Sequence, residues 1–185
     1  MKKWLIVFII YFVLVLIDGG LTLYNTPDLS WEGNPLVTHF HLGWGALITV
    51  NAIVVAAFFI GSRFTFEKYK TVVADVTNFR EYVSMLFYNR PDKFVWSFYK
   101  LPKNWKPFWA CLAYVLCYSL IIGRAITDFE WIAETLNWET SAYDRFRGHL
   151  LFGRLDIAVG LIAAVVLLFV WLIKEYKKGS KQNSL

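Results

Sequence analysis

The sequence predicts an all-α integral membrane protein, a bundle of four transmembrane helices in a single domain covering 1–185. Three observations lead to this class. The 185 residues are 57% hydrophobic and 19% aromatic, and the mean hydropathy of +0.45 exceeds that of an ordinary soluble domain. Four apolar segments approach the roughly 20 residues that a spanning helix needs. Lys and Arg are abundant in some connecting segments and scarce in others.

The four apolar segments define the predicted spans in chain order. They cover about 4–24, 42–60, 108–126 and 155–173. An even number of spans places both ends of the chain on the same side of the membrane. Cys111 and Cys117 lie six residues apart within the third span, so they do not share a helix face and are expected to be apolar core residues rather than a disulfide.

The basic residues assign the two sides of the membrane, because Lys and Arg concentrate in cytoplasmic segments. Lys2 and Lys3 precede the first span, several lysines follow the last, and 61–107 is rich in both residue types, whereas 26–40 has none. Both termini and the central connection are therefore predicted to be cytoplasmic, in a bacterial-type inner membrane. The net charge of +5, gathered on this side, suits anionic inner-leaflet lipids rather than nucleic acid.

The central connection predicts a helix of its own. Apolar residues recur at helical spacing over 66–87, with charged residues between them, which indicates an amphipathic helix lying in the cytoplasmic interface. The following segment, 94–109, is dense in aromatic residues alternating with Lys. Such residues settle at the level of the lipid head groups, although a docking surface for a partner protein would have the same composition.

Two pairs of matching segments predict an internal repeat. His41-Leu42-Gly43-Trp44-Gly45 corresponds to His149-Leu150-Leu151-Phe152-Gly153, and upstream of each lies Leu29-Ser30-Trp31-Glu32 or Leu136-Asn137-Trp138-Glu139. Each copy opens the second span of a hairpin. Two hairpins of the same orientation would be related by a pseudo-twofold axis along the membrane normal, with close helix packing at small residues such as Gly43, Gly45 and Gly160.

Four ionisable residues are expected at one level in the outer part of the membrane. Asp18 lies 14 residues after Trp4, roughly 21 Å along a helix, and Arg124 reaches a similar height in the third span. Arg154 and Asp156 enter the fourth span from outside. Charges within a membrane usually face the protein interior and pair, so the expected pairs are Asp18 with Arg124 and Arg154 with Asp156. These four residues are also the candidate catalytic residues.

A metal site is predicted just outside that level. Glu32 and His41 from the first hairpin, with Glu139 and His149 from the second, would supply four ligands suited to zinc or iron, and His39 is a further candidate. A haem held by His41 and His149 is an alternative. The simpler interpretation is structural, because histidines at the start of a span also anchor helix ends in the interface. Asn51, in the middle of the second span, is expected to hydrogen-bond across helices.

The first hairpin also resembles a known pattern. Asp18, Thr22 and the turn Glu32-Gly33-Asn34-Pro35 resemble an uncharacterised family of small four-span bacterial membrane proteins with an intramembrane Asp and a Glu-x-Asn-Pro turn. That family implies no known activity. Asp18-Gly19-Gly20-Leu21-Thr22 is also similar to the first motif of lipoprotein signal peptidases, but the remaining motifs of those enzymes are missing, so their catalytic aspartates are not carried over.

Three functions remain open on the sequence. The first is a non-enzymatic subunit or accessory factor of a membrane assembly, with a polar, metal-binding pocket opening outward and other membrane-protein subunits or further copies of itself as partners. The second is an intramembrane enzyme acting on a lipid or lipid-linked substrate, with Asp18 or Asp156 as acid or base and Arg124 and Arg154 holding an anionic head group. The third is a small transporter, which would need a polar path to the inner face.

Overall fold

The structure is a computed structural model that describes residues 1–30, 37, 39–136, 138 and 155–181. Across this part of the chain it is all-helical, and four helices are long and apolar enough to cross a membrane. They are α1 (Lys3–Asn25), α3 (Trp44–Arg63, continued by the π-helical turn η1, Phe64–Lys68), α5 (Trp105–Thr135) and α7 (Leu155–Lys181). The prediction of an all-α integral membrane protein with four spans is confirmed.

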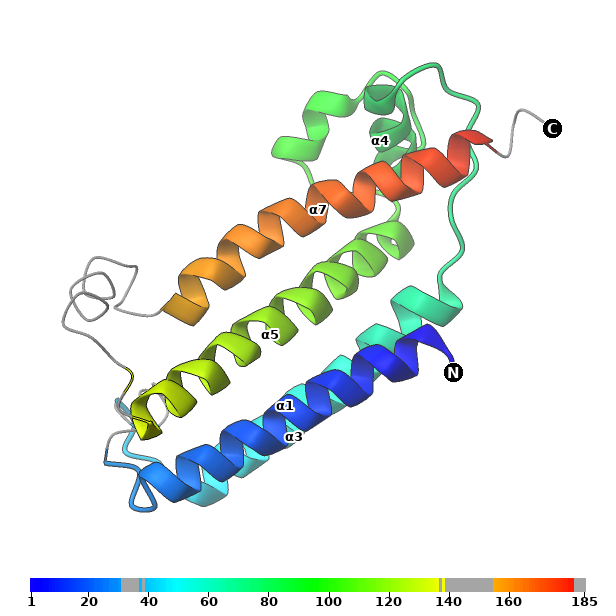
Figure 1. Ribbon diagram of the computed structural model, residues 1–185. Coiled ribbons are helices and arrows are strands. Elements are labelled where there is room, and N and C mark those ends of the chain that lie inside the picture. The colour runs from blue at the N-terminus through cyan, green and yellow to red at the C-terminus, as the bar shows by residue number, and fades with distance from the viewer. Residues whose placement is uncertain (31–36, 38, 137, 139–154, 182–185) are drawn as a thin grey trace.

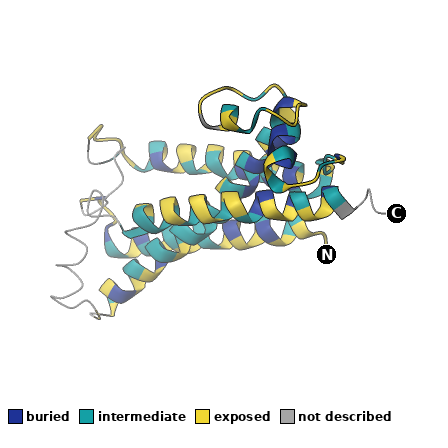
Figure 2. Ribbon diagram, turned by 90° about the horizontal axis from the view of Figure 1, so that it is seen from above, coloured by how far each residue is buried: buried dark blue, intermediate teal, exposed yellow. Residues whose placement is uncertain are grey.

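The long helices form an open row around α5. In Figure 1, α7 lies along one side of α5, and the α1–α3 pair lies along the other. Because α5 separates the two sides, α1, α3 and α7 each keep a broad face covered by no other helix. Figure 2 shows exposed residues along these faces, and they are large apolar side chains such as Leu16, Ile48 and Phe169. Such faces suit the hydrocarbon of a bilayer.

Close helix contacts occur at different glycines from those expected. A Cβ atom added at Gly43, Gly45 or Gly160 would meet no atom of the described residues within 4 Å, so this part of the chain does not show the predicted close packing at these glycines. Gly61 instead approaches Ala113 of α5, and Gly123 approaches the Asp156 carbonyl of α7, with 3.5 and 3.7 Å from an added Cβ. Both glycines lie where other helices touch α5.

The two chain ends lie at the same end of the row. Figure 1 shows the start of α1 and the end of α7 there, together with α4 (Phe79–Tyr88) and the short 3₁₀ helix η2 (Phe94–Phe98). An ion pair between Lys2 and Glu67 connects the start of α1 to η1 at this end, and Arg63 contacts the same carboxylate at 3.2 Å. The ends of α1 and α5 lie at the opposite end.

The central connection is helical over a shorter range than the predicted 66–87. After η1, residues 69–78 run without helix, and α4 covers only Phe79–Tyr88. The reason lies at Asn78, whose side-chain oxygen accepts a 3.0 Å hydrogen bond from the Glu81 N–H while the Glu81 carboxylate accepts from the Thr77 N–H. This capping box starts a helix at Phe79. Asn89, with a left-handed φ of 56°, ends it.

The apolar face of α4 packs on protein rather than on lipid. Tyr82 and Leu86 are fully buried in a core cluster with Cys111 and Tyr114 of α5 and Trp171 of α7. The apolar side chains of this helix are thus covered by the two long helices, and its expected position in the membrane interface stays a prediction. Figure 2 shows the buried residues that gather where α4 meets them.

One glycine allows the connection to approach α7. The Tyr82 hydroxyl donates a 2.9 Å hydrogen bond to the Val72 carbonyl, and both groups lie against Gly179. A Cβ at Gly179 would lie 2.6 Å from Tyr82 Cε2 and 2.6 Å from the Val72 oxygen, closer than any real contact. The absence of a side chain at this position is what lets residues 69–78 and α4 pack against α7.

Candidate functional site

Three helices bring their polar side chains together within the membrane-spanning region. Arg124 of α5 donates from Nη1 to Asp18 Oδ2 of α1 at 2.5 Å and from Nη2 to Asn51 Oδ1 of α3 at 2.8 Å. Asn51 in turn donates to the Leu47 carbonyl at 3.0 Å, which fixes the orientation of its amide. The expected Asp18–Arg124 pair and the expected cross-helix bond of Asn51 are both present, and they share one guanidinium.

The depth of this cluster follows from helix geometry. Asp18 precedes the end of α1 by seven residues, and Asn51 follows the start of α3 by seven, so each lies about 10 Å from the helix end away from the termini. Their side chains and that of Arg124 are mostly buried, with 14% of Asp18 and 22% of Arg124 exposed. A charge in such a place is costly unless it is paired, and this pair neutralises itself.

Tyr11 closes the cluster toward the termini. Its side chain is 2% exposed and its ring stacks on Phe58 of α3, with the ring centroids 4.0 Å apart and the planes 5° apart. The hydroxyl reaches the Arg124 guanidinium. Between Tyr11 and the start of α1, Val7 and Cys117 belong to the same apolar core cluster.

A second carboxyl group lies near the pair. Asp128 follows Arg124 by four residues on α5 and is 4% exposed, and neither of its oxygens has a hydrogen-bond partner. Both Asp18 and Arg124 are close enough to act on it electrostatically. The cluster therefore contains two carboxyl groups and one guanidinium, and Asp128 is the member whose oxygens are left to accept a hydrogen bond from something else.

A groove between α1 and α3 leads to the cluster. It has a volume of about 780 Å³, and Asp18, Asn51 and Thr22 are the polar side chains among apolar ones. Small residues line both walls, Gly19 on α1 and the pair Ala52 and Ala56 on α3. The lining of the groove thus combines a carboxylate and an amide with mostly apolar side chains.

Further polar contacts connect α1 and α5 toward the end that is distant from the termini. The Thr135 hydroxyl donates to Asn25 Oδ1 at 3.1 Å, and Thr22 and Thr26 are 2% and 1% exposed. Beyond α1, Asp28 accepts hydrogen bonds from the Ser30 N–H and hydroxyl, which hold the pKa of its carboxyl below the usual value. These contacts fix the turn that follows α1.

The other predicted site residues are only partly placed. Asp156 lies in the first turn of α7, and its backbone approaches Gly123, the neighbour of Arg124, on the α7 side of α5. Asp18 and Asp156 thus flank α5 from opposite sides. Arg154, the expected partner of Asp156, lies outside the residues that the structure describes.

The metal prediction stays a prediction. His39 and His41 are exposed, and His41 has a left-handed φ of 52° with its N–H bonded to the Val37 carbonyl at 3.0 Å. Glu32, Glu139 and His149 lie outside the described residues. Among those that are described, no group of three or more His, Cys, Asp or Glu side chains is placed to hold a metal ion.

Sequence reasoning missed two members of the cluster. For Asn51 the sequence predicts a hydrogen bond across helices, but it does not identify Arg124 as the partner. Asp128 lies beyond 126, where the third span is predicted to end, whereas α5 continues to Thr135. The spacing of four residues from Arg124, which puts both on one helix face, was the available signal.

Comparison with known proteins adds no family. No family model, curated protein or solved structure matches this chain.

Proposed function

We propose that this chain is a non-enzymatic accessory subunit of a membrane assembly, and that it receives a transmembrane helix of a partner protein in the groove between α1 and α3. The observation that carries the proposal is the composition of that groove. Its lining combines small residues with large apolar ones, and Asp18 and Asn51 supply polar groups. Gly19 has no atom within 4 Å of where its Cβ would be, so a partner helix has room there.

General rules of helix packing in membranes support this occupant. Without a hydrophobic driving force between helices in lipid, association relies on close approach at small residues and on interhelical hydrogen bonds. The groove offers both: Ala52 and Ala56 are spaced one turn apart, and Asp18 and Asn51 lie about 10 Å from the helix ends away from the termini. A partner helix with a Ser, Thr or Asn side chain at that depth would complete the packing.

The experiment compares two neighbouring substitutions. Ala56 and Ala57 are both exposed on α3, but only Ala56 lines the groove. Affinity purification of the tagged full chain from native membranes in mild detergent is expected to yield a stoichiometric membrane-protein partner with the wild type and with Ala57→Leu. Ala56→Leu is expected to lose that partner. Retention by both variants, or the absence of any stoichiometric partner, would contradict the proposal.

The orientation and location are part of the proposal. The end that carries the termini, α4 and η2 is cytoplasmic, and the cluster at Asp18 lies in the outer half of a bacterial-type inner membrane. The distribution of Lys and Arg supports this, because the basic residues gather at that end.

The two hairpins α1–α3 and α5–α7 are proposed to be an internal repeat, supported by the paired His and Trp-Glu segments of the sequence.

A zinc or iron ion at Glu32, His41, Glu139 and His149 also belongs to the proposal. The donor set supports it, since imidazole and carboxylate groups suit both metals. Elemental analysis of the purified full chain tests it: about one zinc or iron per chain is expected, and much less with His149→Ala. A chain without stoichiometric metal would contradict this part and leave the groove untouched.

A second candidate function has one observation in its favour. Asp18 is reachable from the apolar groove, and Asp128 beside it has no hydrogen-bond partner, so a lipid or lipid-linked substrate would meet a carboxyl group able to act as acid or base. Lipid analysis of a deletion strain separates the two functions. Accumulation of one lipid precursor that is reversed by the wild-type gene and not by Asp128→Asn would favour the enzyme.

A third candidate, a small transporter, has no comparable support.

A further inference from the structure

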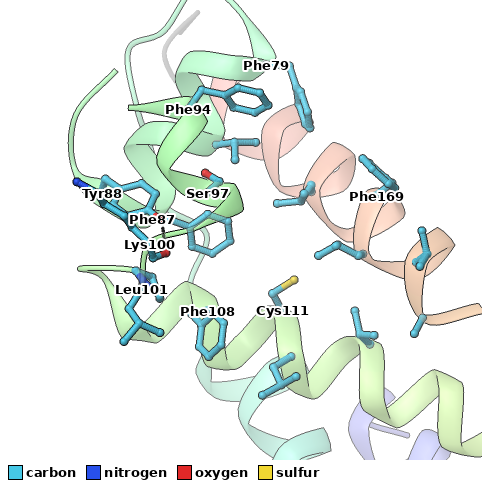
Figure 3. Close-up of a pocket in the computed structure, with 18 residues that line it drawn as sticks. Phe79, Phe87, Tyr88, Phe94, Ser97, Lys100, Leu101, Phe108, Cys111 and Phe169 are labelled. Atoms are coloured by element: carbon cyan, nitrogen blue, oxygen red, sulfur yellow. Dashed lines mark hydrogen bonds between the residues drawn. The ribbon is translucent and has the colours of Figure 1, made fainter. Parts of the chain in front are cut away.

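A second cavity lies at the other end of the molecule, where α4 and η2 cover the start of α5 and the end of α7. Its volume is about 600 Å³, within the roughly 300–1,000 Å³ typical of small-ligand sites. Figure 3 shows Phe87 and Phe108 on one side, the α7 residue Phe169 on the other, and the Cys111 thiol directed into the space between them.

The shape of the cavity is that of a slot along the membrane-spanning helices. Its lining runs from Phe108 to Val115 on α5 and from Ala164 to Leu172 on α7, which is about 10 to 12 Å along each helix axis. Val165 and Phe169 are more than half exposed, so the slot opens between α5 and α7 toward the surface that faces hydrocarbon. A water-filled cavity needs polar partners for each water molecule, and these walls are almost entirely apolar.

The polar groups of the cavity lie at one end. Ser97, Lys100 and the hydroxyl of Tyr88 belong to the segment that roofs the slot. The Tyr88 hydroxyl lies 2.9 Å from the Trp96 carbonyl and 2.7 Å from the Lys100 carbonyl, which fixes η2 against α4. The Lys100 ammonium lies 4.0 Å from the Trp96 ring centroid. Its charge therefore lies beside η2, at the covered end of the slot.

The charged side chains around η2, at the covered end of the slot, are mainly basic. Lys93 also lies over the Trp96 ring, at 4.9 Å, and Arg80 lies over Phe94 at 5.9 Å. Asp92 is the acidic neighbour, and it is paired with Lys93 at 2.6 Å. An apolar slot that opens to hydrocarbon and ends at Lys100, which forms no ion pair with the described part of the chain, is complementary to an amphiphile with a long apolar chain and a negative head.

We propose that this cavity binds one acyl chain of an anionic phospholipid, with the lipid phosphate held by Lys100 and Ser97. The placement requires only that this end of the helices lies at a membrane surface, and it does not depend on the partner groove between α1 and α3. A partner helix is a poorer fit, because α4 and η2 close the slot at one end. The lipid would join η2 to α5 and α7 and hold the connection in place.

Photo-crosslinking tests the proposal directly. The full chain is reconstituted in phosphatidylcholine nanodiscs that contain a phosphatidylglycerol with a diazirine in its acyl chain, and the crosslinked residues are mapped by mass spectrometry. Labelling is expected at Cys111, Leu112 and Leu168. A phosphatidylcholine bearing the same diazirine is the control lipid, and it is expected to label these residues several-fold less.

Two matched pairs of variants separate the cavity from the general lipid surface. Val165 and Val166 are exposed to a similar extent, but only Val165 lines the cavity, so Val165→Trp is expected to reduce the labelling several-fold and Val166→Trp to leave it unchanged. Lys100→Gln is expected to abolish the preference for phosphatidylglycerol, whereas Lys103→Gln, at an exposed residue outside the cavity, is expected to preserve it.

Each alternative occupant gives a different result. Equal labelling by the two lipids would overturn the anionic head group, and labelling spread evenly over α1, α3 and α7 would show a bulk lipid contact only. Crosslinks insensitive to Val165→Trp would place the chain elsewhere. If a variant unfolds, the thermal unfolding of the wild type decides: phosphatidylglycerol is expected to raise its unfolding temperature above that in phosphatidylcholine alone, and the absence of any shift would overturn the proposal.

Discussion

Asp18, Arg124 and Asn51 connect three helices through one guanidinium, which makes Arg124 the residue on which the packing of α1, α3 and α5 depends most. Removing one partner of a buried ion pair leaves a charge without compensation, which typically costs about 3 to 5 kcal/mol. We therefore expect Asp18→Asn to lower the free energy of unfolding by about 3 kcal/mol, measured by SDS titration of the chain in detergent micelles.

The double variant supplies the control for this prediction. Asp18→Asn with Arg124→Gln removes both charges and keeps two amides that can hydrogen-bond, so it is expected to recover part of the loss. Arg124→Gln is measured alone as well, and the difference between the double-variant loss and the sum of the two single losses is the coupling between the two residues. Losses that add fully in the double variant would mean that the two side chains act independently, contrary to the contact between them.

Asp128 is expected to behave in the opposite way. Its carboxyl group is buried and its oxygens accept no hydrogen bond from the described residues, so burial disfavours the charged form in the folded state. Asp128→Asn keeps the shape of the side chain and removes the ionisable group, and we expect an unchanged or higher free energy of unfolding in the same titration. A loss comparable with that of Asp18→Asn would show that Asp128 has a partner that stabilises the fold.

The sequence could predict part of this cluster for a physical reason. A charged residue in an apolar span has to be paired, and Asp18 and Arg124 were at matching depth, so their pairing followed. Asn51 was expected near the middle of its span, where a polar side chain has several helices in reach, so its partner did not follow. Asp128 was missed because hydropathy marks where the apolar stretch ends, whereas the helix continues for two further turns.

At the scale of elements, the start of α4 depends on a titratable group. The N–H and hydroxyl of Thr77 and the Asn78 amide donate to the Glu81 carboxylate, and these hydrogen bonds hold the pKa of Glu81 below its ordinary value of 4.5. A carboxylate whose pKa is lower in the folded state contributes stability above its ordinary pKa, and loses that contribution as the pH falls through the folded value.

The corresponding prediction concerns α4 alone. On acidification below that ordinary value, the amide protons of the first turn of α4 are expected to exchange with solvent faster relative to those of α5, as measured by hydrogen–deuterium exchange. Glu81→Gln, which can still accept hydrogen bonds but does not titrate, is expected to remove this pH dependence. Persistence of the pH dependence in Glu81→Gln would assign it to another group.

The contact of α4 with α7 gives a prediction at Gly179. A Cβ there would overlap the Val72 carbonyl, which belongs to the backbone and cannot rotate away, so Gly179→Ala is expected to push residues 69–78 off α7. Overpacking of this kind typically costs about 1 to 3 kcal/mol. Limited proteolysis is expected to cut the connection faster in the variant. Gly160→Ala is the control, because it meets no atom within 4 Å, and it is expected to match the wild type.

Elements were predictable to different degrees. The four spans follow from hydropathy, since only a helix satisfies its own backbone groups in hydrocarbon. The connection was harder, because the apolar residues of 69–78 have helical spacing, yet several are β-branched and the cap at Asn78 sets a later start. A capping box of Asn78 and Glu81 was visible in the sequence and could have corrected the helix start.

At the scale of the whole molecule, the order of the helices was not predictable. Hydropathy predicts that four helices cross the membrane. Which of these helices contact one another depends on how side chains fit at a few positions such as Gly61 and Gly123. The resulting row leaves α7 in contact with α5 and α4, and puts the Asp18 cluster on the opposite side of α5 from α7. The groove and the lipid cavity consequently lie in separate parts of the molecule.

The proposed orientation of the chain in the membrane can be tested by labelling single cysteines introduced at either end of the helices. The native Cys111 and Cys117 are buried, with 5% and 2% exposure, so a membrane-impermeant maleimide is expected to leave the wild type unlabelled. His39 and Lys70 are exposed at opposite ends of the helices. Because the end with the termini is proposed to be cytoplasmic, His39→Cys is expected to react in intact spheroplasts and Lys70→Cys only after the membrane is permeabilised. The reverse pattern would invert the molecule, placing the Asp18 cluster in the inner half of the bilayer and the lipid cavity in the outer leaflet.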